Sequence, residues 1–192
     1  MSRRALFLDR DGTVTREVGY VNHPSRLELI PGAAVTIRRC NEAGVPVVLV
    51  TNQAGAARGY FPIALVYEVH ARLDALLAAA GARLDGVYFS PFVKEGKVPP
   101  YNVDHPWRKP NAGMLEMAAR DLDLDLPRSV AVGDKITDVE MIQGVGGKGV
   151  FVLTGYGRGE LEYRRDTWPT EPDHITEDLG SAADWILAEL TR

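Results

Sequence analysis

The sequence has a single cysteine, Cys40, among its 192 residues. One thiol cannot form an intramolecular disulfide, which is typical of proteins from a reducing cytoplasm. An excess of basic residues is also missing. The formal net charge is −4, which argues against general nucleic-acid binding and against a basic membrane-binding face. No apolar run approaches membrane-spanning length, and the one after the basic start is too short for a signal-peptide core. We therefore expect a cytoplasmic monomer that binds neither nucleic acid nor membrane.

The order of apolar runs predicts the fold. Short apolar runs bounded by polar residues predict buried strands, and they alternate with stretches of helical period. This alternation is typical of a doubly wound, mostly parallel sheet of Rossmann type, with three α/β/α layers. The expected strands cover residues 5–8, 45–50, 86–89, 129–132 and 150–153, with a short edge strand at 174–175. The expected helices cover residues 31–43, 62–80 and 113–122, with a short one after residue 138 and a last one capped by Ser181.

A proline-rich stretch at residues 90–110 interrupts this pattern and has no usable periodicity. A loop of this length in a compact domain is usually functional or disordered. Its Phe92, Tyr101 and Trp107 favour an ordered, packed loop. The chain length suits one well-cored domain, so we expect residues 1–192 to form a single domain.

Two carboxylates, Asp9 and Asp11, directly follow the first predicted strand. Gly12 permits the tight turn that keeps both acids at the carboxyl end of this strand. Two anions held this close repel each other, so they need a cation or a shared proton. A divalent metal with hard oxygen ligands meets this need, and Mg²⁺ is the expected ion.

Other polar side chains also follow predicted strands. Thr51-Asn52 comes after the second strand and Asp134 after the fourth, while Lys109 closes the long loop. The carboxyl ends of parallel strands share one edge of a sheet, so these residues are expected to converge with the acid pair. Together they could hold Mg²⁺ and a phosphoryl group. The scattered histidines His23, His70 and His174 have no second ligand at useful spacing, and we expect them to be structural or solvated.

Four motifs in this order resemble those of the haloacid dehalogenase (HAD) superfamily of phosphotransferases. They are Asp9–Thr13 (DRDGT), Thr51-Asn52, Lys109-Pro110 and Gly133–Asp138 (GDKITD). Finer features are similar to the D-glycero-D-manno-heptose bisphosphate phosphatases and their histidinol-phosphatase relatives. These features are the arginine inside DRDGT, the run TNQAGAARG at residues 51–59, and the arginine before Lys109. The resemblance implies a phosphatase for a small phosphorylated metabolite, with a heptose 1,7-bisphosphate dephosphorylated at position 7 as the expected substrate.

The resemblance also implies a division of roles. Asp9 would be the nucleophile that forms an aspartyl-phosphate. Asp11 would protonate the leaving alkoxide and then activate water. Thr51 and Lys109 would bind the phosphoryl oxygens on which charge builds in the transition state.

The metal set is implied in the same way. Mg²⁺ would be held by Asp9, the backbone carbonyl of Asp11 and Asp134. Asp138 lies one helical turn after Asp134 and either orients this metal shell or stabilises the start of a helix.

Substrate contacts are expected around this centre. The segment from Glu17 to Tyr20 corresponds to a substrate-contacting segment of the relatives, and Arg108 is the expected contact for a second phosphate. Further polar and positively charged side chains follow the second and fourth predicted strands. The expected substrate-binding residues are Glu17, Gly19, Tyr20, Asn52, Gln53, Arg58, Arg108 and Lys135.

In two respects the sequence departs from the family. Many relatives bind zinc in the long loop through a Cys-x-His pair and a Cys-x-Cys pair. Here the corresponding positions are Ser90, Phe92, His105 and Trp107. One candidate ligand of four is too few for a tetrahedral site, so no zinc is expected. The intervals between motifs leave no room for a separate cap domain.

Two alternatives remain open from the sequence. Within phosphatases, histidinol phosphate or a nucleotide could be the substrate. From a different class, a phospho-accepting receiver module also combines aspartates, a hydroxyl residue, a lysine and Mg²⁺ on a similar sheet. Receivers phosphorylate an aspartate after a middle strand, where this chain has Ser90-Pro91. The spacing of the acid pair therefore favours the phosphatase.

Overall fold

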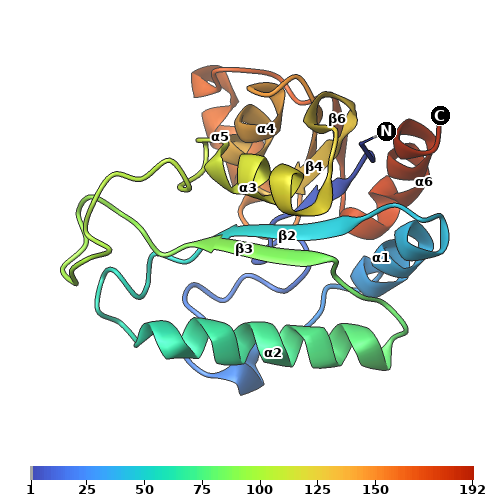
Figure 1. Ribbon diagram of the computed structural model, residues 1–192. Coiled ribbons are helices and arrows are strands. Elements are labelled where there is room, and N and C mark those ends of the chain that lie inside the picture. Colours follow the sequence, from blue (N-terminus) through green and yellow to red (C-terminus); the bar gives the residue numbers. More distant parts are fainter. Residues whose placement is uncertain (1) are drawn as a thin grey trace.

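The computed structural model describes residues 2–192 and places six strands in one sheet (Figure 1). The order across the sheet is β3-β2-β1-β4-β5-β6, and every neighbouring pair is parallel. The predicted doubly wound parallel sheet is therefore confirmed. The strands are β1 (Leu6–Leu8), β2 (Val47–Asn52), β3 (Gly86–Ser90), β4 (Val130–Gly133), β5 (Lys148–Val152) and β6 (His174–Thr176).

Helices cover both faces of the sheet and complete three layers. The buried faces of α1, α2 and α6 pack on one side, and those of α3, α4 and α5 pack on the other (Figure 1). The helices are α1 (Ala33–Glu42), α2 (Ile63–Ala79), α3 (Gly113–Leu122), α4 (Ile136–Gln143), α5 (Gly157–Arg164) and α6 (Leu179–Leu190).

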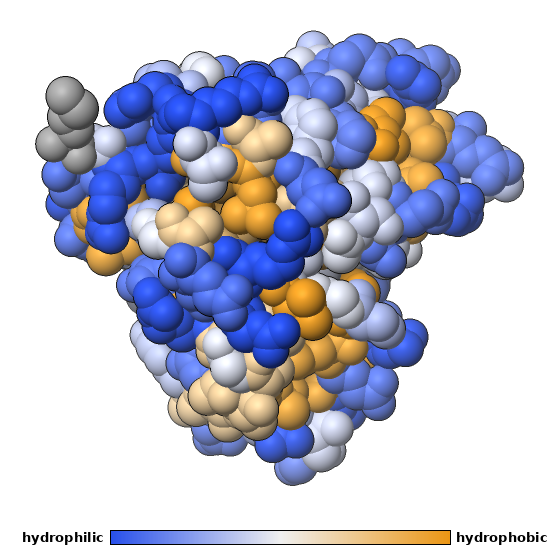
Figure 2. Space-filling model, turned by 90° about the vertical axis from the view of Figure 1, so that its right-hand side faces the viewer, coloured by the Kyte–Doolittle hydropathy of each residue, from blue (hydrophilic) through white to orange (hydrophobic). Residues whose placement is uncertain are grey.

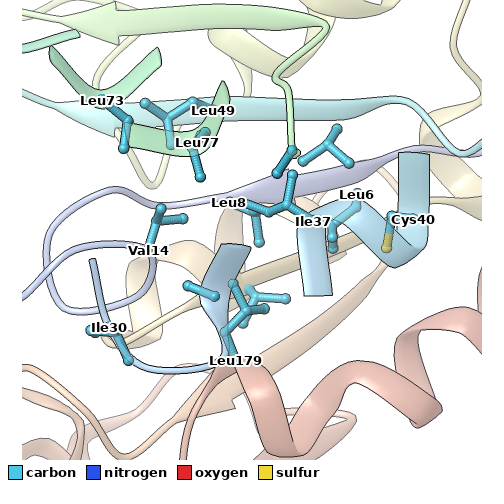
Figure 3. Close-up of a cluster of buried hydrophobic side chains, with 14 of the residues drawn as sticks. Leu6, Leu8, Val14, Ile30, Ile37, Cys40, Leu49, Leu73, Leu77 and Leu179 are labelled. Carbon is cyan, nitrogen blue, oxygen red and sulfur yellow. The ribbon is translucent and has the colours of Figure 1, made fainter. Parts of the chain in front are cut away.

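The central strand β1 is buried on both faces. Leu6 and Leu8 point into the larger apolar cluster, where Figure 3 shows them beside Ile37 and Cys40 of α1. Phe7 points the other way, into the cluster under α3 and α4. Alternate residues of a strand face opposite sides of the sheet, so a strand covered on both sides needs a continuous apolar run. Each such buried side chain contributes roughly 1.5–3 kcal/mol of transfer free energy.

The strand order places a crevice beside β1. From β1 the chain first builds outward through β2 and β3, then returns to build outward through β4, β5 and β6. Ligands of open α/β sheets bind at the carboxyl edge where the order reverses. The long loop after β3 leaves the sheet at this edge, whereas both termini lie at the opposite end (Figure 1). That opposite end is covered mostly by hydrophilic residues, with apolar residues showing between them (Figure 2).

The long loop between β3 and α3 is ordered by aromatic packing. The ring of Phe92 stacks on His105 at 3.8 Å between centroids, and His105 meets Trp107 edge-on at 5.6 Å. The Arg108 guanidinium donates to the carbonyl of Phe92 at 3.1 Å. The prediction of an ordered, packed loop is confirmed. Three of the four positions compared above with zinc ligands therefore hold rings that contact one another.

Other local predictions were wrong. Helix α5 was not expected, because Gly157 and Gly159 disfavour a helix and its surface is polar. The N-cap of α6 is Asp178, whose carboxylate accepts from the backbone NH of Ser181. Strand β2 runs on to Asn52, so Thr51 and Asn52 lie inside it. Within residues 2–192, no helix has both the length and the hydropathy that a membrane span requires.

Candidate active site

Three carboxylates meet at the carboxyl edge of the sheet. Asp9 follows β1, Asp134 follows β4, and Asp138 lies in the first turn of α4. All three are buried, and each offers an oxygen within 4.8 Å of the others. Burial, followed by the charges of Asp9 and Asp138, raises the pKa of Asp134 to about 8. Burial also raises the pKa of Asp138 to about 6 against the opposing effect of Lys109. Three acids this close therefore need positive charge beside them.

Lys109 supplies one positive charge to this cluster. Its ammonium lies 2.6 Å from an oxygen of Asp138 and 2.9 Å from an oxygen of Asp9, and it donates to the carbonyl of Val50 at 3.1 Å. Burial alone would lower the pKa of Lys109, but the carboxylates of Asp138 and Asp9 raise it above its ordinary value. The lysine is therefore a fixed cation at the base of the crevice.

Asp134 keeps one carboxylate oxygen free for a metal. Its Oδ2 accepts from the backbone NH of Tyr156 at 2.8 Å. Its Oδ1 is buried and has no hydrogen-bond partner among residues 2–192. A buried carboxylate oxygen without a donor is costly unless a ligand occupies it. With the oxygens of Asp9 and Asp138 nearby, the donor set fits a hard divalent cation such as Mg²⁺.

Two glycines enclose Asp134. Gly12 and Gly155 have positive φ angles of 84° and 58°, and a Cβ at either position would collide with Oδ2 of Asp134. The hydroxyl of Thr154 donates to the carbonyl of Gly12 at 2.6 Å and ties the two loops together. The backbones of the loops after β1 and β5 therefore pack directly against this carboxylate from two sides.

Asp11 lies apart from the three clustered acids and is held by Arg10. The Arg10 guanidinium donates from Nε to Oδ1 of Asp11 at 3.0 Å and from Nη2 to Oδ2 at 2.7 Å. Arg10 is only 1% exposed, whereas the Asp11 side chain retains 15% of its exposure and lines the crevice. This bidentate pair fixes the plane of a carboxylate that can still reach a ligand.

Two of the expected substrate contacts direct their side chains at protein groups. The Asn52 amide accepts from the backbone NH of Lys109 at 3.1 Å and donates to its carbonyl at 3.3 Å. The Gln53 amide nitrogen donates to Asp11 at 2.9 Å and to the hydroxyl of Thr51 at 3.0 Å, and its oxygen accepts from Arg10 at 2.9 Å. Both amides therefore position other residues of the crevice.

The crevice is a cavity of about 350 Å³. Every residue predicted to bind substrate, to bind metal or to take part in the reaction lies along it except Asp134, which is buried behind its wall. Its lining consists of Asp9, Asp11, Glu17, Gly19, Tyr20, Thr51, Asn52, Gln53, Ala54, Arg58, Arg108, Lys109, Lys135, Thr137, Asp138 and Tyr156.

Positive charge gathers on the walls of this cavity. Arg58 and Arg108 are both half-buried, and Nε of Arg58 is enclosed without a hydrogen-bond partner in the described chain. Burial, followed by the nearby charge of Arg58, lowers the pKa of Arg108. The ammonium of Lys135 lies 4.4 Å from the ring centroid of Tyr156. Among residues 2–192, Glu17 is the one acid that lines this cavity besides Asp9, Asp11 and Asp138, and burial raises its pKa.

Sequence reasoning missed three features of the site. Arg10 was noticed only as part of a motif, and its contact with Asp11 needs the tertiary structure. Thr137 lines the cavity and was noticed only as part of the motif at Gly133–Asp138, whereas Tyr156 lines it without any recognisable pattern. The one available signal for Tyr156 was its place after the fifth strand, at the same sheet edge as the other loops.

Comparisons with known proteins agree with this geometry. A HAD-hydrolase-like family model matches residues 106–182. The chain is 48% identical to the D-glycero-D-manno-heptose-1,7-bisphosphate 7-phosphatase of Thermosynechococcus vestitus, over 99% of this chain and 98% of that protein. It is 37% identical to the D-glycero-beta-D-manno-heptose-1,7-bisphosphate 7-phosphatase of Yersinia pestis, over 97% and 90%. A crystal structure of the D,D-heptose 1,7-bisphosphate phosphatase from B. bronchiseptica, complexed with magnesium and phosphate, superposes with a TM-score of 0.83 at 33% identity. This match covers 97% of this chain and 99% of that one.

Proposed function

Since the chain belongs to the HAD-like family of heptose-1,7-bisphosphate 7-phosphatases, we propose that it hydrolyses the 7-phosphate of a D-glycero-D-manno-heptose 1,7-bisphosphate. The observation that carries the proposal is the buried cluster of Asp9, Asp134 and Asp138 around Lys109, at the open edge of the sheet. The receiver alternative is set aside, because the relatives that match over the whole chain are phosphatases.

The first step is transfer of the phosphoryl group to Asp9. A carboxylate oxygen of Asp9 attacks phosphorus, and the bond between phosphorus and the sugar oxygen breaks. Asp11 gives its proton to the departing alkoxide, which is otherwise a poor leaving group. Lys109 holds Asp9 in place through its 2.9 Å contact and presents positive charge where negative charge builds. The hydroxyl of Thr51, which is buried near the end of β2 and lines the cavity, would donate to a phosphoryl oxygen.

The second step regenerates the enzyme. Asp11, now a carboxylate, takes a proton from water, and the water oxygen attacks phosphorus of the aspartyl-phosphate. The bond between phosphorus and Asp9 breaks and inorganic phosphate leaves. The fork from Arg10 and the amide of Gln53 keep Asp11 in one orientation for both proton transfers.

Mg²⁺ fits the carboxylate set and would be held by Asp9, Asp134 and the backbone carbonyl of Asp11. When bound, it would neutralise negative charge on the phosphoryl oxygens. Asp138 would act through Lys109, because its Oδ1 accepts from that ammonium and its Oδ2 from the backbone NH of Lys135 at 3.3 Å.

The guanidinium pair of Arg58 and Arg108 is the proposed site for the second phosphate. Two half-buried cations beside each other are unfavourable without an anion, and Nε of Arg58 still lacks an acceptor. Glu17, Gly19, Tyr20 and Lys135 would contact the sugar between the two phosphates.

We also propose that the enzyme needs no zinc and works as a monomer in the cytoplasm. The aromatic contacts of Phe92, His105 and Trp107 can order the long loop without a metal. Burial raises the pKa of the Cys40 thiol to about 11, so this cysteine is suited to remain a reduced core residue. Light scattering coupled to size exclusion would test the monomer.

The test of the function is a substrate panel with Mg²⁺, in which phosphate release is measured. The panel contains heptose 1,7-bisphosphate, heptose 1-phosphate, histidinol phosphate and nucleoside monophosphates, with Asp9→Asn as the blank. The heptose bisphosphate should have the highest kcat/KM, by at least about tenfold, and phosphorus NMR should show loss of the 7-phosphate. Faster turnover of histidinol phosphate or a nucleotide would refute the substrate, and steady turnover by Asp9→Asn would refute the covalent intermediate.

A further inference from the structure

A buried histidine lies behind the site on the inner face of α2. His70 is 6% exposed and shares this face with the core residues Val66, Val69 and Leu73. Its ring packs edge-on against Phe89 at 5.4 Å between centroids. An imidazole among apolar side chains needs a hydrogen-bond partner. Its Nε2 lies 3.3 Å from Nη1 of Arg10.

The contact gives Nη1 of Arg10 a hydrogen-bond acceptor, as the other two nitrogens already have theirs. Nε and Nη2 of Arg10 donate to Asp11, and Nη2 also donates to Gln53. Nη1 faces His70. A guanidinium can only donate, so Nε2 of His70 must be the acceptor and its ring must be neutral. Burial, followed by the charge of Arg10, lowers the pKa of His70 to about 3, which agrees with a neutral ring.

We propose that His70 is a positioning residue for the phosphatase reaction: through its hydrogen bond to Arg10 it fixes the guanidinium that aligns the Asp11 carboxylate. This inference rests on the proposed role of Asp11 as proton donor and acceptor. Only the His70 contact ties Nη1 of Arg10 to α2 among the described residues. Without it, the guanidinium loses its connection to α2 and is held by Asp11 and Gln53 alone. The carboxylate plane would then move relative to the leaving oxygen.

The test compares leaving groups, because a merely structural histidine would slow all esters alike. The value of kcat/KM depends only on the steps up to formation of the aspartyl-phosphate, which include departure of the leaving group. The Asp11 proton matters for a basic leaving group such as phenolate and little for 4-nitrophenolate. His70→Phe removes the acceptor and keeps a ring. We expect kcat/KM for phenyl phosphate to fall about tenfold and that for 4-nitrophenyl phosphate to change less than about twofold.

His70→Gln is the matched variant, since its amide oxygen can accept where Nε2 does. It should retain the wild-type dependence of kcat/KM on leaving-group pKa. Leu73→Ala, on the same face of α2, should lower thermal stability without changing that dependence. If His70→Phe does not fold, His70→Asn replaces it, because its amide is one methylene too short to reach Arg10.

Equal losses of kcat/KM on both aryl esters in His70→Phe would overturn the proposal. It would also be overturned if kcat/KM of His70→Gln depended more steeply on leaving-group pKa than that of wild type. The aryl esters do not contain the heptose. A negative result with the heptose bisphosphate would therefore refute the proposed substrate without affecting the comparison of the two aryl esters.

Discussion

Lys109 and Asp138 form a buried ion pair at 2.6 Å, with side chains that are 3% and 2% exposed. The two residues come from different parts of the chain, one closing the long loop and the other in the first turn of α4. Two charges removed from water this completely are held by their mutual attraction and by further hydrogen bonds. The ion pair therefore links the architecture of the site to the stability of the protein.

Removing the lysine should destabilise the fold as well as the chemistry. Lys109→Met leaves buried carboxylates without a cation, and we expect a loss of roughly 3–5 kcal/mol in the free energy of unfolding. Urea unfolding without metal measures this loss. The double variant Lys109→Met/Asp138→Asn should recover part of it, because one unpaired charge is removed. Asp138→Asn alone completes the cycle. If the loss in the double variant equals the sum of the losses in the two single variants, the two residues are not coupled.

Magnesium should stabilise the folded protein through Asp134. A ligand that binds only the native state adds about 2.7 kcal/mol at a hundred times its Kd, so Mg²⁺ should raise Tm. Asp134→Asn should abolish this response and should make the metal-free protein more stable, because it removes an acid whose charged form is disfavoured by burial and then by the charges of Asp9 and Asp138. Asp166→Asn, an exposed acid, is the control. A Tm response to Mg²⁺ that survives in Asp134→Asn would place the metal elsewhere.

The second phosphate should depend on Arg108. Loss of a charged hydrogen bond costs roughly 1.5–3 kcal/mol, so Arg108→Ala should raise KM for the heptose bisphosphate at least about tenfold. The same variant should change kcat/KM for 4-nitrophenyl phosphate less than about twofold, since that ester has one phosphate. Arg120→Ala, on the surface of α3, should behave as wild type. Equal losses on both esters would assign Arg108 to the reacting phosphate or to the fold.

Stability should fall at acidic pH through His70. Its pKa is about 3 in the folded protein and 6.5 as the ordinary value, so the unfolded chain binds a proton first as the pH falls. The stability from the neutral ring is complete above pH 6.5 and is lost toward pH 3, at about 1.4 kcal/mol per pH unit. Between pH 7 and 5, the advantage of wild type over His70→Phe should shrink by about 2 kcal/mol. His23→Phe, at an exposed position, is the control and should show the same pH dependence of stability as wild type. If the stability of His70→Phe also follows that of wild type in parallel across this pH range, the neutral ring is contradicted.

The long loop should be ordered without zinc. Elemental analysis of the purified protein should find far less than one zinc per chain. The variant Ser90→Cys/Phe92→His/His105→Cys/Trp107→Cys, which restores four ligands, should bind one zinc and gain in Tm. One zinc per chain in the wild type would overturn this expectation.

The parts of the fold that depend on local pattern could be predicted from the sequence. The strand at Leu6–Leu8 is continuous and apolar and stops at an acid, so its position and its end are both readable. The N-cap of α6 was misplaced because Asp178 and Ser181 are both good capping residues three positions apart, and only the backbone decides between them. Helix α5 carries glycines in its first turn, and its Leu161 packs against a cluster that includes Phe151 of β5, a contact that exists only in the folded protein.

The site shows the same division between local and tertiary information. Convergence of Asp9 and Asp134 follows from strand direction and could be predicted, whereas Lys109 reaches them from the end of the long loop that leaves the same edge of the sheet. The geometry of Arg10 could not be predicted, because its three acceptors lie on the adjacent residue, on β2's following loop and on α2. The contacts of the Asn52 and Gln53 amides with protein groups could not be predicted either, because their partners become neighbours only after folding.

The backbone packing around Asp134 restricts what evolution or engineering can change there. Gly12 and Gly155 are 143 positions apart, yet each occupies the space that the other's side chain would need. A single alanine at either position has to displace the carboxylate or separate the two loops, and no compensating change at the other glycine can make room. The two glycines therefore constrain each other, and any redesign of this site has to keep both of them without side chains.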